Sequence, residues 1–244
     1  VILNNQPKLV AKLASVTPRS SEYKRIIKLA RNELRKYYGL FRGETKRDLH
    51  DLMGQLHDHL KDLNILKRIL ELHTSTKERL PYYGSLYQSL FTITGKPKSI
   101  LDLGCGLNPF SVPFLKLKNT YYYAYDVGQK EIEAINNYFT LIRQKGHAFV
   151  TDLTKIETFP ATDVAFLFKI TDMIDKGQGH KQTETLLHKI PARYIIVSFA
   201  TLTMSHKAMR APRRRWMEWL CQRLGYTYSL VEIPNELFYV IKKY

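Results

Sequence analysis

The stretch Leu101–Pro109, which reads LDLGCGLNP, constrains the fold of this chain more than any other feature. It continues a short apolar run, residues 98–101, that is typical of a buried parallel strand. Its glycines allow a tight turn and a close approach of the backbone to a ligand. Asp126 closes a second strand-like run after about the twenty residues that separate turn and acid in a nucleotide-binding βαβ unit. This spacing predicts a Rossmann-like α/β fold that binds a nucleoside.

The same turn also limits the kind of nucleoside. Pro109 stands where the pattern G-x-G-x-x-G would place its third glycine, so a dinucleotide pyrophosphate lacks its usual seat. S-adenosylmethionine (SAM) carries no phosphate and fits the pattern D-x-G-x-G better, with Asp126 accepting hydrogen bonds from two ribose hydroxyls. A purely structural strand-to-helix connection is the alternative, because short glycine motifs often match by chance.

Charge and composition limit the function classes. The net charge of +16 in 244 residues predicts a polyanionic partner, most simply nucleic acid, although a generally basic surface would give the same value. No apolar run approaches the roughly 18 residues of a membrane span, and the N-terminal residues show no signal-peptide pattern. Cys105 and Cys221 form neither a disulfide framework nor a zinc set, which favours a cytoplasmic protein without a metal site.

Residues 1–92 predict a helical N-terminal domain that docks on RNA. Ser20 or Ser21 can cap a helix whose apolar positions recur at helical spacing. The opposite face is basic and is followed by Tyr37-Tyr38, and aromatic rings beside cations suit nucleic acid. A merely solvated face is the alternative. The RNA contacts expected here are Lys24, Arg25, Lys28, Arg31 and Arg35.

Arg79 stands in a helical segment just before the predicted cofactor strand. Ser75 and Glu78 have the spacing of a capping box, which accounts for those two residues and leaves Arg79 unexplained. A guanidinium at this place can hold the carboxylate of a bound amino acid through two parallel hydrogen bonds. Pro81 predicts a kink or a helix restart near Leu80.

Residues 93–244 predict an α/β domain, because strand and helix patterns alternate along them. Only Pro234-Asn235 separates the last two strands, so these two must form an antiparallel hairpin. A seven-stranded, mostly parallel sheet that ends in such a hairpin is the topology of class I SAM-dependent methyltransferases. The strands expected are 98–103, 121–126, 147–152, 163–170, 193–200, 227–233 and 236–243, and the helices lie near 110–117, 129–144, 180–190 and 211–224.

Ligands of open α/β sheets bind at the carboxyl ends of the strands. Asp152 falls at such an end and can accept from the adenine amine, with Leu153 on the ring, although a helix-capping role would also explain it. Lys169 follows the fourth strand, where it would contact phosphate or fix the target base, unless it only extends its ammonium group into water. Phe199 ends the fifth strand and is expected to position the target with Lys169.

The absence of two sequence motifs limits which atoms can be the methyl acceptor. Phe168-Lys169-Ile170 stands where base-amine methyltransferases carry Asn/Asp-Pro-Pro-aromatic, and the chain has no Pro-Cys nucleophile, which argues against amine and cytosine-C5 chemistry. A ring nitrogen such as guanine N7 has a lone pair and no proton, so its methylation requires positioning rather than a general base. The methyl acceptor that fits best is therefore a ring nitrogen.

The segment 201–215 follows the fifth strand without periodicity, as substrate-gripping loops often do. Met209 or Trp216 could pack on a flipped base, but burial of Trp216 and Trp219 in the core is the favoured interpretation. The residues of this segment expected to contact RNA are Lys207, Met209, Arg210, Arg213, Arg214 and Arg215.

Taken together, these segments resemble the Arm/Rmt (FmrO-like) family of aminoglycoside-resistance methyltransferases, which act on 16S rRNA. The resemblance covers about residues 65–244, and Leu202 stands where the family usually has an arginine. It rests on His73–Leu80, Leu101–Pro109, Phe168-Lys169, Val197–Phe199, the neighbourhood of Lys207–Met209, and Glu236–Lys243.

The resemblance implies SAM-dependent methylation of guanine N7 in the decoding site of the 30S subunit. A monomer is the default expectation. It implies that Arg79 holds the SAM carboxylate and that Asp126 and Asp152 hold ribose and adenine. Methylation of another RNA nucleotide, such as adenine N1, and a non-catalytic RNA-binding module remain open alternatives. The cofactor-binding residues expected are His73, Arg79, Asp102, Gly104, Gly106, Asn108, Asp126, Asp152, Leu153 and Phe168.

Overall fold

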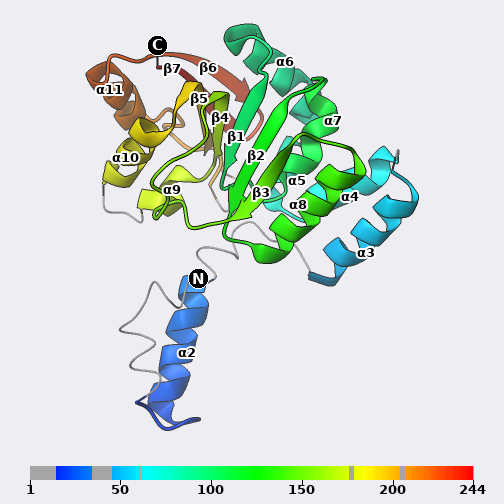
Figure 1. Ribbon diagram of the computed structural model, residues 1–244. Coiled ribbons are helices and arrows are strands. Elements are labelled where there is room, and N and C mark those ends of the chain that lie inside the picture. The colour runs from blue at the N-terminus through cyan, green and yellow to red at the C-terminus, as the bar shows by residue number, and fades with distance from the viewer. Residues whose placement is uncertain (1–14, 35–45, 61, 176–178, 204–206, 244) are drawn as a thin grey trace. The chain divides into compact units, whose positions relative to one another are not determined.

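The computed structural model describes residues 15–34, 46–60, 62–175, 179–203 and 207–243 (Figure 1). The chain forms two compact units, residues 1–43 and 44–244, and each is considered by itself. In the first unit, helix α2 spans Ser21–Leu34 and begins where the Tyr23 N–H donates to Ser20 Oγ at 3.1 Å. This cap confirms the predicted helix start at Ser20.

The exposed side of α2 is basic. Lys24, Arg25 and Lys28 are exposed and Ile26 is buried, as the amphipathic pattern predicts. Two further residues of the predicted RNA-contacting face, the side chain of Arg31 and the whole of Arg35, lie outside the described residues.

The second unit is built on a seven-stranded sheet with the order β3-β2-β1-β4-β5-β7-β6. Neighbours from β3 to β5 pair in parallel, whereas β7 pairs antiparallel with both β5 and β6. This confirms the predicted sheet and its closing hairpin. The strands are β1 (Ser99–Leu103), β2 (Tyr121–Asp126), β3 (Gly146–Val150), β4 (Thr162–Phe168), β5 (Ala192–Ala200), β6 (Thr227–Ile233) and β7 (Glu236–Lys242).

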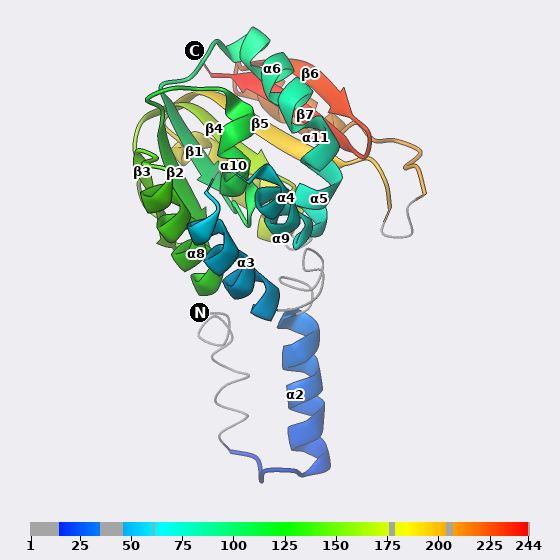
Figure 2. The same cartoon turned by 90° about the vertical axis from the view of Figure 1, so that its right-hand side faces the viewer.

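Helices cover both faces of this sheet, as the two views in Figures 1 and 2 show. One face carries α3 (Lys46–Asp58), α4 (Leu63–Glu71), α5 (Thr74–Arg79), η3 (Leu80–Tyr82), α6 (Tyr83–Thr94), η4 (Asn108–Ser111), α7 (Val112–Leu115) and α8 (Gln129–Leu141). The other face carries α9 (Thr171–Asp175), α10 (Lys181–Lys189) and α11 (Arg215–Arg223).

The expected domain boundary near residue 92 does not coincide with a gap in packing. Leu56 of α3, Leu70 of α4 and Leu90 of α6 share one buried cluster with Ile100 and Phe166 of the sheet. The leucine stripes of these helices are therefore buried against the strands, and the compact unit begins at residue 44.

Local details of the helices differ from the sequence pattern. Helices α3 and α4 are separate, because Asp62 caps α4 by accepting from the Asn64 N–H at 2.8 Å. The predicted Ser75–Glu78 capping box is wrong, since α5 begins at Thr74 without a side-chain cap. The restart predicted at Pro81 is confirmed by the 3-10 turn η3 between α5 and α6. Among the described helices, none is long and apolar enough to cross a bilayer.

Candidate functional site

The glycine turn after β1 is closely packed. Gly104 and Gly106 have φ of +68° and +51°, a region that L side chains rarely adopt. A Cβ on Gly104 would lie 2.6 Å from Ile170 Cγ1, and one on Gly106 would lie 2.9 Å from His73 Nδ1. The backbone therefore needs glycine at both places, and His73 lies beside the turn as expected of a cofactor-binding residue.

Asp126 joins the end of β2 to this turn. Its Oδ2 accepts from the Gly106 N–H at 2.9 Å, and its Oδ1 accepts from the Gly128 N–H at 2.9 Å. Each carboxylate oxygen has further lone pairs, so the same acid can also accept from ribose hydroxyls. The predicted pairing of glycine turn and acid is thus present in the geometry.

Arg79 is the most deeply buried cation at this edge, with 1% of its surface exposed. Its guanidinium lies 4.9 Å from the centre of the Phe168 ring, and Nε donates to Glu236 Oε2 at 2.8 Å. Burial disfavours its charge, but the attraction of Glu236 and Tyr83, together with hydrogen bonds to both, outweighs burial and raises the pKa of Arg79. One edge of the guanidinium is thereby fixed by the protein.

The other edge of Arg79 has unused hydrogen-bonding capacity. Nη1 is 3.5 Å from Asn108 Oδ1, and the buried Nη2 has no hydrogen-bond partner among the described residues. A buried donor without an acceptor costs about 1–3 kcal/mol, so such an atom calls for an explanation. An amino-acid carboxylate would satisfy it, and the nearby turn and acid suit a nucleoside. These residues therefore fit SAM.

Sequence reasoning missed the carboxylate that holds Arg79 in place, Glu236, and the ion pair of Glu78 beside it. Glu236 is 1% exposed, and its second oxygen accepts a short hydrogen bond from Ser198 Oγ. Glu78 lies nearby and pairs with Lys169 instead of closing a capping box. The antiparallel register pairs Glu236 with Ala200, at the carboxyl end of β5, so the predicted hairpin could have placed this acid at the ligand edge.

Lys169 belongs to the same charged cluster. Its Nζ lies 2.6 Å from Glu78 Oε2 and 3.4 Å from Glu236 Oε2, and the side chain is 9% exposed. The expected contact with a phosphate does not match this placement, because two carboxylates already surround the ammonium group. The expected extension of Lys169 into water is wrong for the same reason. The cluster of Glu78, Arg79, Lys169 and Glu236 has no net formal charge.

Asp102 points into the protein rather than toward a cofactor. Its Oδ2 accepts from the Tyr122 hydroxyl at 2.7 Å and from Asn108 Nδ2 at 2.9 Å. The side-chain oxygen of Asn108, Oδ1, in turn accepts from the Tyr83 hydroxyl at 2.9 Å. The predicted cofactor contact of Asp102 is therefore replaced by a buried network that orients Asn108 beside Arg79.

The buried position of Asp102 predicts a pH effect on stability. Burial raises its pKa to about 6, against the opposing hydrogen bonds from Tyr122 and Asn108. An unfolded Asp titrates near pH 4, so between about pH 4 and 6 the folded chain retains a proton that the unfolded chain releases. On account of this residue the free energy of unfolding falls by roughly 3 kcal/mol as pH rises through that window.

The variant Asp102→Asn should lose this dependence. Its free energy of unfolding, measured by urea titration at several pH values, should rise relative to wild type between about pH 4 and 6. Parallel stability curves for the two proteins would contradict the assignment.

One predicted site residue lies elsewhere than expected. Phe199 is 1% exposed and packs edge-on against Trp216 and Tyr239, on the opposite face of the sheet from Phe168. It therefore contributes to the core and not to target positioning.

Asp152 follows the carboxyl end of β3, as expected. Its Oδ1 accepts from the Thr154 N–H at 3.0 Å and so caps a turn, which makes the helix-capping alternative wrong. Leu153 packs partly against the same core as Phe199. The adenine contacts of Asp152 and Leu153 stay predictions.

The basic loop after β5 is partly folded inward. The guanidinium of Arg214 lies 5.2 Å from the centre of the Phe199 ring and donates to the Ala200 carbonyl at 3.3 Å. Arg213 pairs with Glu218 at 2.8 Å. Met209 is half-buried, whereas Lys207, Arg210 and Arg215 are exposed and can meet a nucleic acid.

The predicted burial of both tryptophans is wrong for one of them. Trp216 is half-buried, but Trp219 is 67% exposed. His50 and His57 are exposed, and each lies beside an aspartate. Within the described residues no group of His, Cys, Asp and Glu is arranged to hold a metal ion.

Comparison with known proteins shows the family of this chain. Residues 6–240 match the family described as "Ribosomal RNA methyltransferase (FmrO)". The chain belongs to this family. Among FmrO-family relatives, a 16S rRNA (guanine(1405)-N(7))-methyltransferase of Micromonospora echinospora is 28% identical over 230 residues, 89% of this chain and 82% of that protein. The enzyme of the same description from Proteus mirabilis is 27% identical over 241 residues, 90% of this chain and 85% of its own length.

Solved structures support the FmrO-family fold. The 16S rRNA methyltransferase RmtF, in complex with S-adenosyl-L-homocysteine, aligns with a TM-score of 0.77 and 21% identity, over 98% of this chain and 91% of that one. The 16S rRNA methylase RmtB aligns with a TM-score of 0.73 and 24% identity, over 97% of this chain and 88% of that one.

Proposed function

We propose that this chain transfers a methyl group from SAM to N7 of a guanine in the decoding site of 16S rRNA, within the 30S subunit, and so confers aminoglycoside resistance. The observation that carries the proposal is the buried Nη2 of Arg79, which lacks a partner beside the Gly104–Gly106 turn. The relatives named above, described as acting on guanine N7 of 16S rRNA, support the choice of substrate.

Methyl transfer to guanine N7 requires the protein mainly to position the methyl donor and the acceptor. SAM supplies an electrophilic methyl group on a sulfonium centre. Guanine N7 has a lone pair and carries no proton, so the residues at the edge of the sheet need only hold donor and acceptor in line. The segment after Phe168 contains Lys169-Ile170-Thr171 and no base-amine motif, which agrees with a reaction that requires no general base.

The direct test is incubation of the protein with 30S subunits and methyl-labelled SAM, followed by mapping of the modified nucleotide. Label on N7 of a decoding-site guanine is the expected result. Label on another nucleotide, such as adenine N1, would overturn the proposed target and keep the enzyme class. Binding of SAM without any labelling of RNA would favour a non-catalytic RNA-binding module.

The basic face of α2 is expected to dock on rRNA. Changing Lys24, Arg25 and Lys28 together to glutamate should weaken binding to 30S subunits by about tenfold or more and leave SAM affinity unchanged. The reason is loss of phosphate contacts, so the salt dependence of 30S binding should also become shallower. Binding would be measured by filter retention at several salt concentrations.

A matched triple variant separates docking from net charge. Lys96, Lys116 and Lys118 are exposed and precede β1 and β2, at the end of the sheet opposite the glycine turn. Changing these three to glutamate alters the net charge equally and should affect 30S binding much less. If both triple variants lose the same affinity for 30S subunits, the basic residues of α2 are only solvated and do not dock on rRNA.

A further inference from the structure

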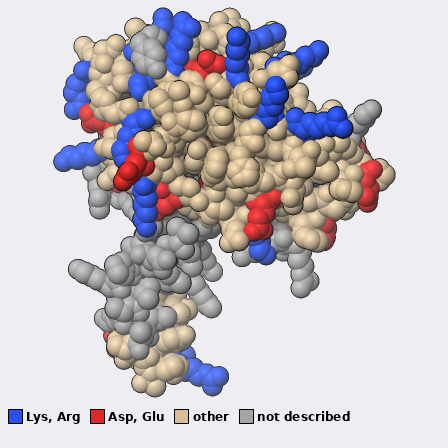
Figure 3. All heavy atoms as spheres, in the orientation of Figure 1, with Lys and Arg blue, Asp and Glu red and all other residues tan. Residues whose placement is uncertain are grey.

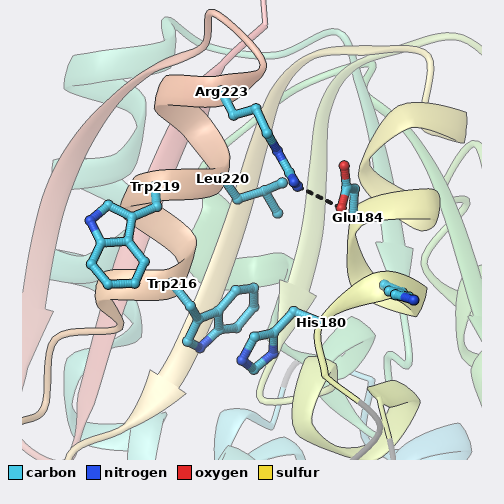
Figure 4. A pocket seen from close by; sticks show the side chains of 7 residues that line it. His180, Glu184, Trp216, Trp219, Leu220 and Arg223 are labelled. Atoms are coloured by element: carbon cyan, nitrogen blue, oxygen red, sulfur yellow. Dashed lines mark ion pairs between the residues drawn. The ribbon is translucent and has the colours of Figure 1, made fainter.

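A cavity of about 370 Å³ lies between α10 and α11, away from Arg79 and the glycine turn. Both tryptophans of the chain contribute to it. Figure 4 shows the α11 residues Trp216, Leu220 and Arg223 facing His180 and Glu184, whereas the indole of Trp219 points away from them on the other side of α11. The lining residues are His180, Lys181, Glu184, Trp216, Trp219, Leu220 and Arg223.

The two tryptophans at this cavity differ in burial and in their packing partners. Trp216 is half-buried and stacks on His180 with ring centres 3.6 Å apart and an angle of 4° between the planes. Asp175 Oδ2 lies 3.3 Å from Nδ1 of the same histidine. Trp219, in contrast, is 67% exposed, so packing within the chain does not explain an indole at this position. An exposed aromatic face is suited to stacking with a partner.

Charges around the cavity favour a polyanion. The only acids of α10 and α11 are Glu184 and Glu218, and each is paired with an arginine, at 2.6 Å to Arg223 and 2.8 Å to Arg213. Lys181 and Arg215 are exposed and have no acidic partner among the described residues. Figure 3 shows several Lys and Arg side chains on this side of the molecule.

The cavity begins at the same edge of the sheet as the cofactor site. Helices α10 and α11 both start on the side of the carboxyl ends of β4 and β5, and Trp216 contacts Phe199 near the end of β5 at 5.7 Å between ring centres. Ser198, one residue earlier, bonds to Glu236 of the Arg79 cluster on the opposite face. A strand of nucleic acid that reaches the cofactor edge can therefore continue over this edge to Trp219.

We infer that an unpaired base of the rRNA substrate stacks on Trp219 beside this cavity, while Lys181 and Arg215 meet the adjoining phosphates. The inference rests on the proposed function, because it adds a second contact for the same RNA. The occupant is single-stranded, since a base inside a duplex cannot offer its face to an indole. A protein partner is disfavoured, because the lining of the cavity includes Lys181 and Arg223, and its one acid, Glu184, is already paired with Arg223.

Tryptophan fluorescence tests the stacking directly, because Trp216 and Trp219 are the only tryptophans in the chain. The variant Trp216→Phe leaves Trp219 as the sole reporter. Titration of this full-length variant with single-stranded poly(A) should quench its emission in a saturable way. The variant Trp219→Phe, which reports only the half-buried Trp216, should show much weaker quenching. Absence of quenching at Trp219 would overturn the inference.

Binding to 30S subunits supplies the second readout. Trp219→Ala should weaken binding by at least about fivefold, since stacking of one base on an aromatic ring contributes that much or more. Trp219→Phe, which keeps an aromatic face, should restore most of the affinity. Tyr121→Ala, at a 47% exposed aromatic that begins β2, at the end of the sheet opposite the carboxyl ends, is the matched control and should bind as wild type.

The outcomes separate this inference from the proposed function. If wild type methylates 30S subunits but Trp219→Ala binds them normally, the inference fails and the proposed function stands. If Trp219→Ala binds 30S subunits weakly but poly(A) does not quench Trp219, the contact is with a ribosomal protein and the inference also fails. If poly(A) quenches Trp219 but 30S subunits are not methylated, base stacking is supported and the proposed function fails.

Discussion

Replacing Arg79 with alanine should lower the affinity for SAM by at least about a hundredfold, because the SAM carboxylate loses a charge-assisted donor in a buried site. The affinity for 5′-methylthioadenosine, which lacks the amino-acid part, should fall much less. Isothermal titration with the two ligands measures both effects. Equal losses for SAM and 5′-methylthioadenosine would show that Arg79 does not hold the carboxylate.

The alanine variant also leaves Glu236 buried near Lys169 without its main partner. Removing one partner of a buried ion pair costs about 3–5 kcal/mol of stability. The single variant is therefore titrated only under conditions in which it is folded. The double variant Arg79→Met with Glu236→Gln removes both charges, while Lys169 keeps Glu78 as its partner. This protein should regain stability and remain defective in SAM binding. If the double variant recovers SAM affinity, Arg79 has only a structural role.

Replacing Asp126 with alanine should weaken SAM and 5′-methylthioadenosine to the same extent, by roughly ten- to a hundredfold. Both ligands contain the ribose, and the carboxylate is expected to accept from its hydroxyls. The change also removes the acceptor that holds the Gly106 and Gly128 N–H groups, so the turn itself should loosen. The contrast between the two ligands distinguishes Asp126 from Arg79.

Asp163 provides the matched control for Asp126. Its carboxylate also accepts from two backbone N–H groups, those of Lys98 and Ser99 at 2.7 and 3.0 Å, but it lies at the opposite end of the sheet. Asp163→Ala should cost stability and leave the affinity for both ligands unchanged. Loss of ligand binding in this variant would mean that loosening of the sheet, and not loss of a ribose contact, explains the effect at Asp126.

The order and type of elements could be predicted because they depend on local patterns. Strand and helix periods alternate from β1 onward, and two residues between the last strands permit only a hairpin. The partnership of Gly106 and Asp126 could also be predicted, because parallel strands bring their carboxyl ends to one edge. These features require no knowledge of which side chains meet.

The contacts that define the site could not be predicted in the same way. Phe199 was expected at the site because it ends a strand, but successive residues of a strand point to opposite faces, and Ser198 is the one on the side of Arg79. Asp102 turns inward because Tyr122, on the neighbouring strand, presents a buried hydroxyl to it. Glu78 matched a local capping rule, while its actual partner, Lys169, is 91 residues away.

The hydrogen bond between Arg79 and Glu236 joins residues 157 positions apart, and this separation has a consequence for the synthesis of this chain itself. A nascent chain that has emerged only through β5 contains the glycine turn, Asp126 and Arg79, but not the acid that fixes the guanidinium. Competence to bind the methyl donor should therefore arise late in translation, when β7 inserts between β5 and β6. A chain arrested before residue 236 is expected to resemble the finished protein in most of its sheet and yet remain unable to bind the methyl donor.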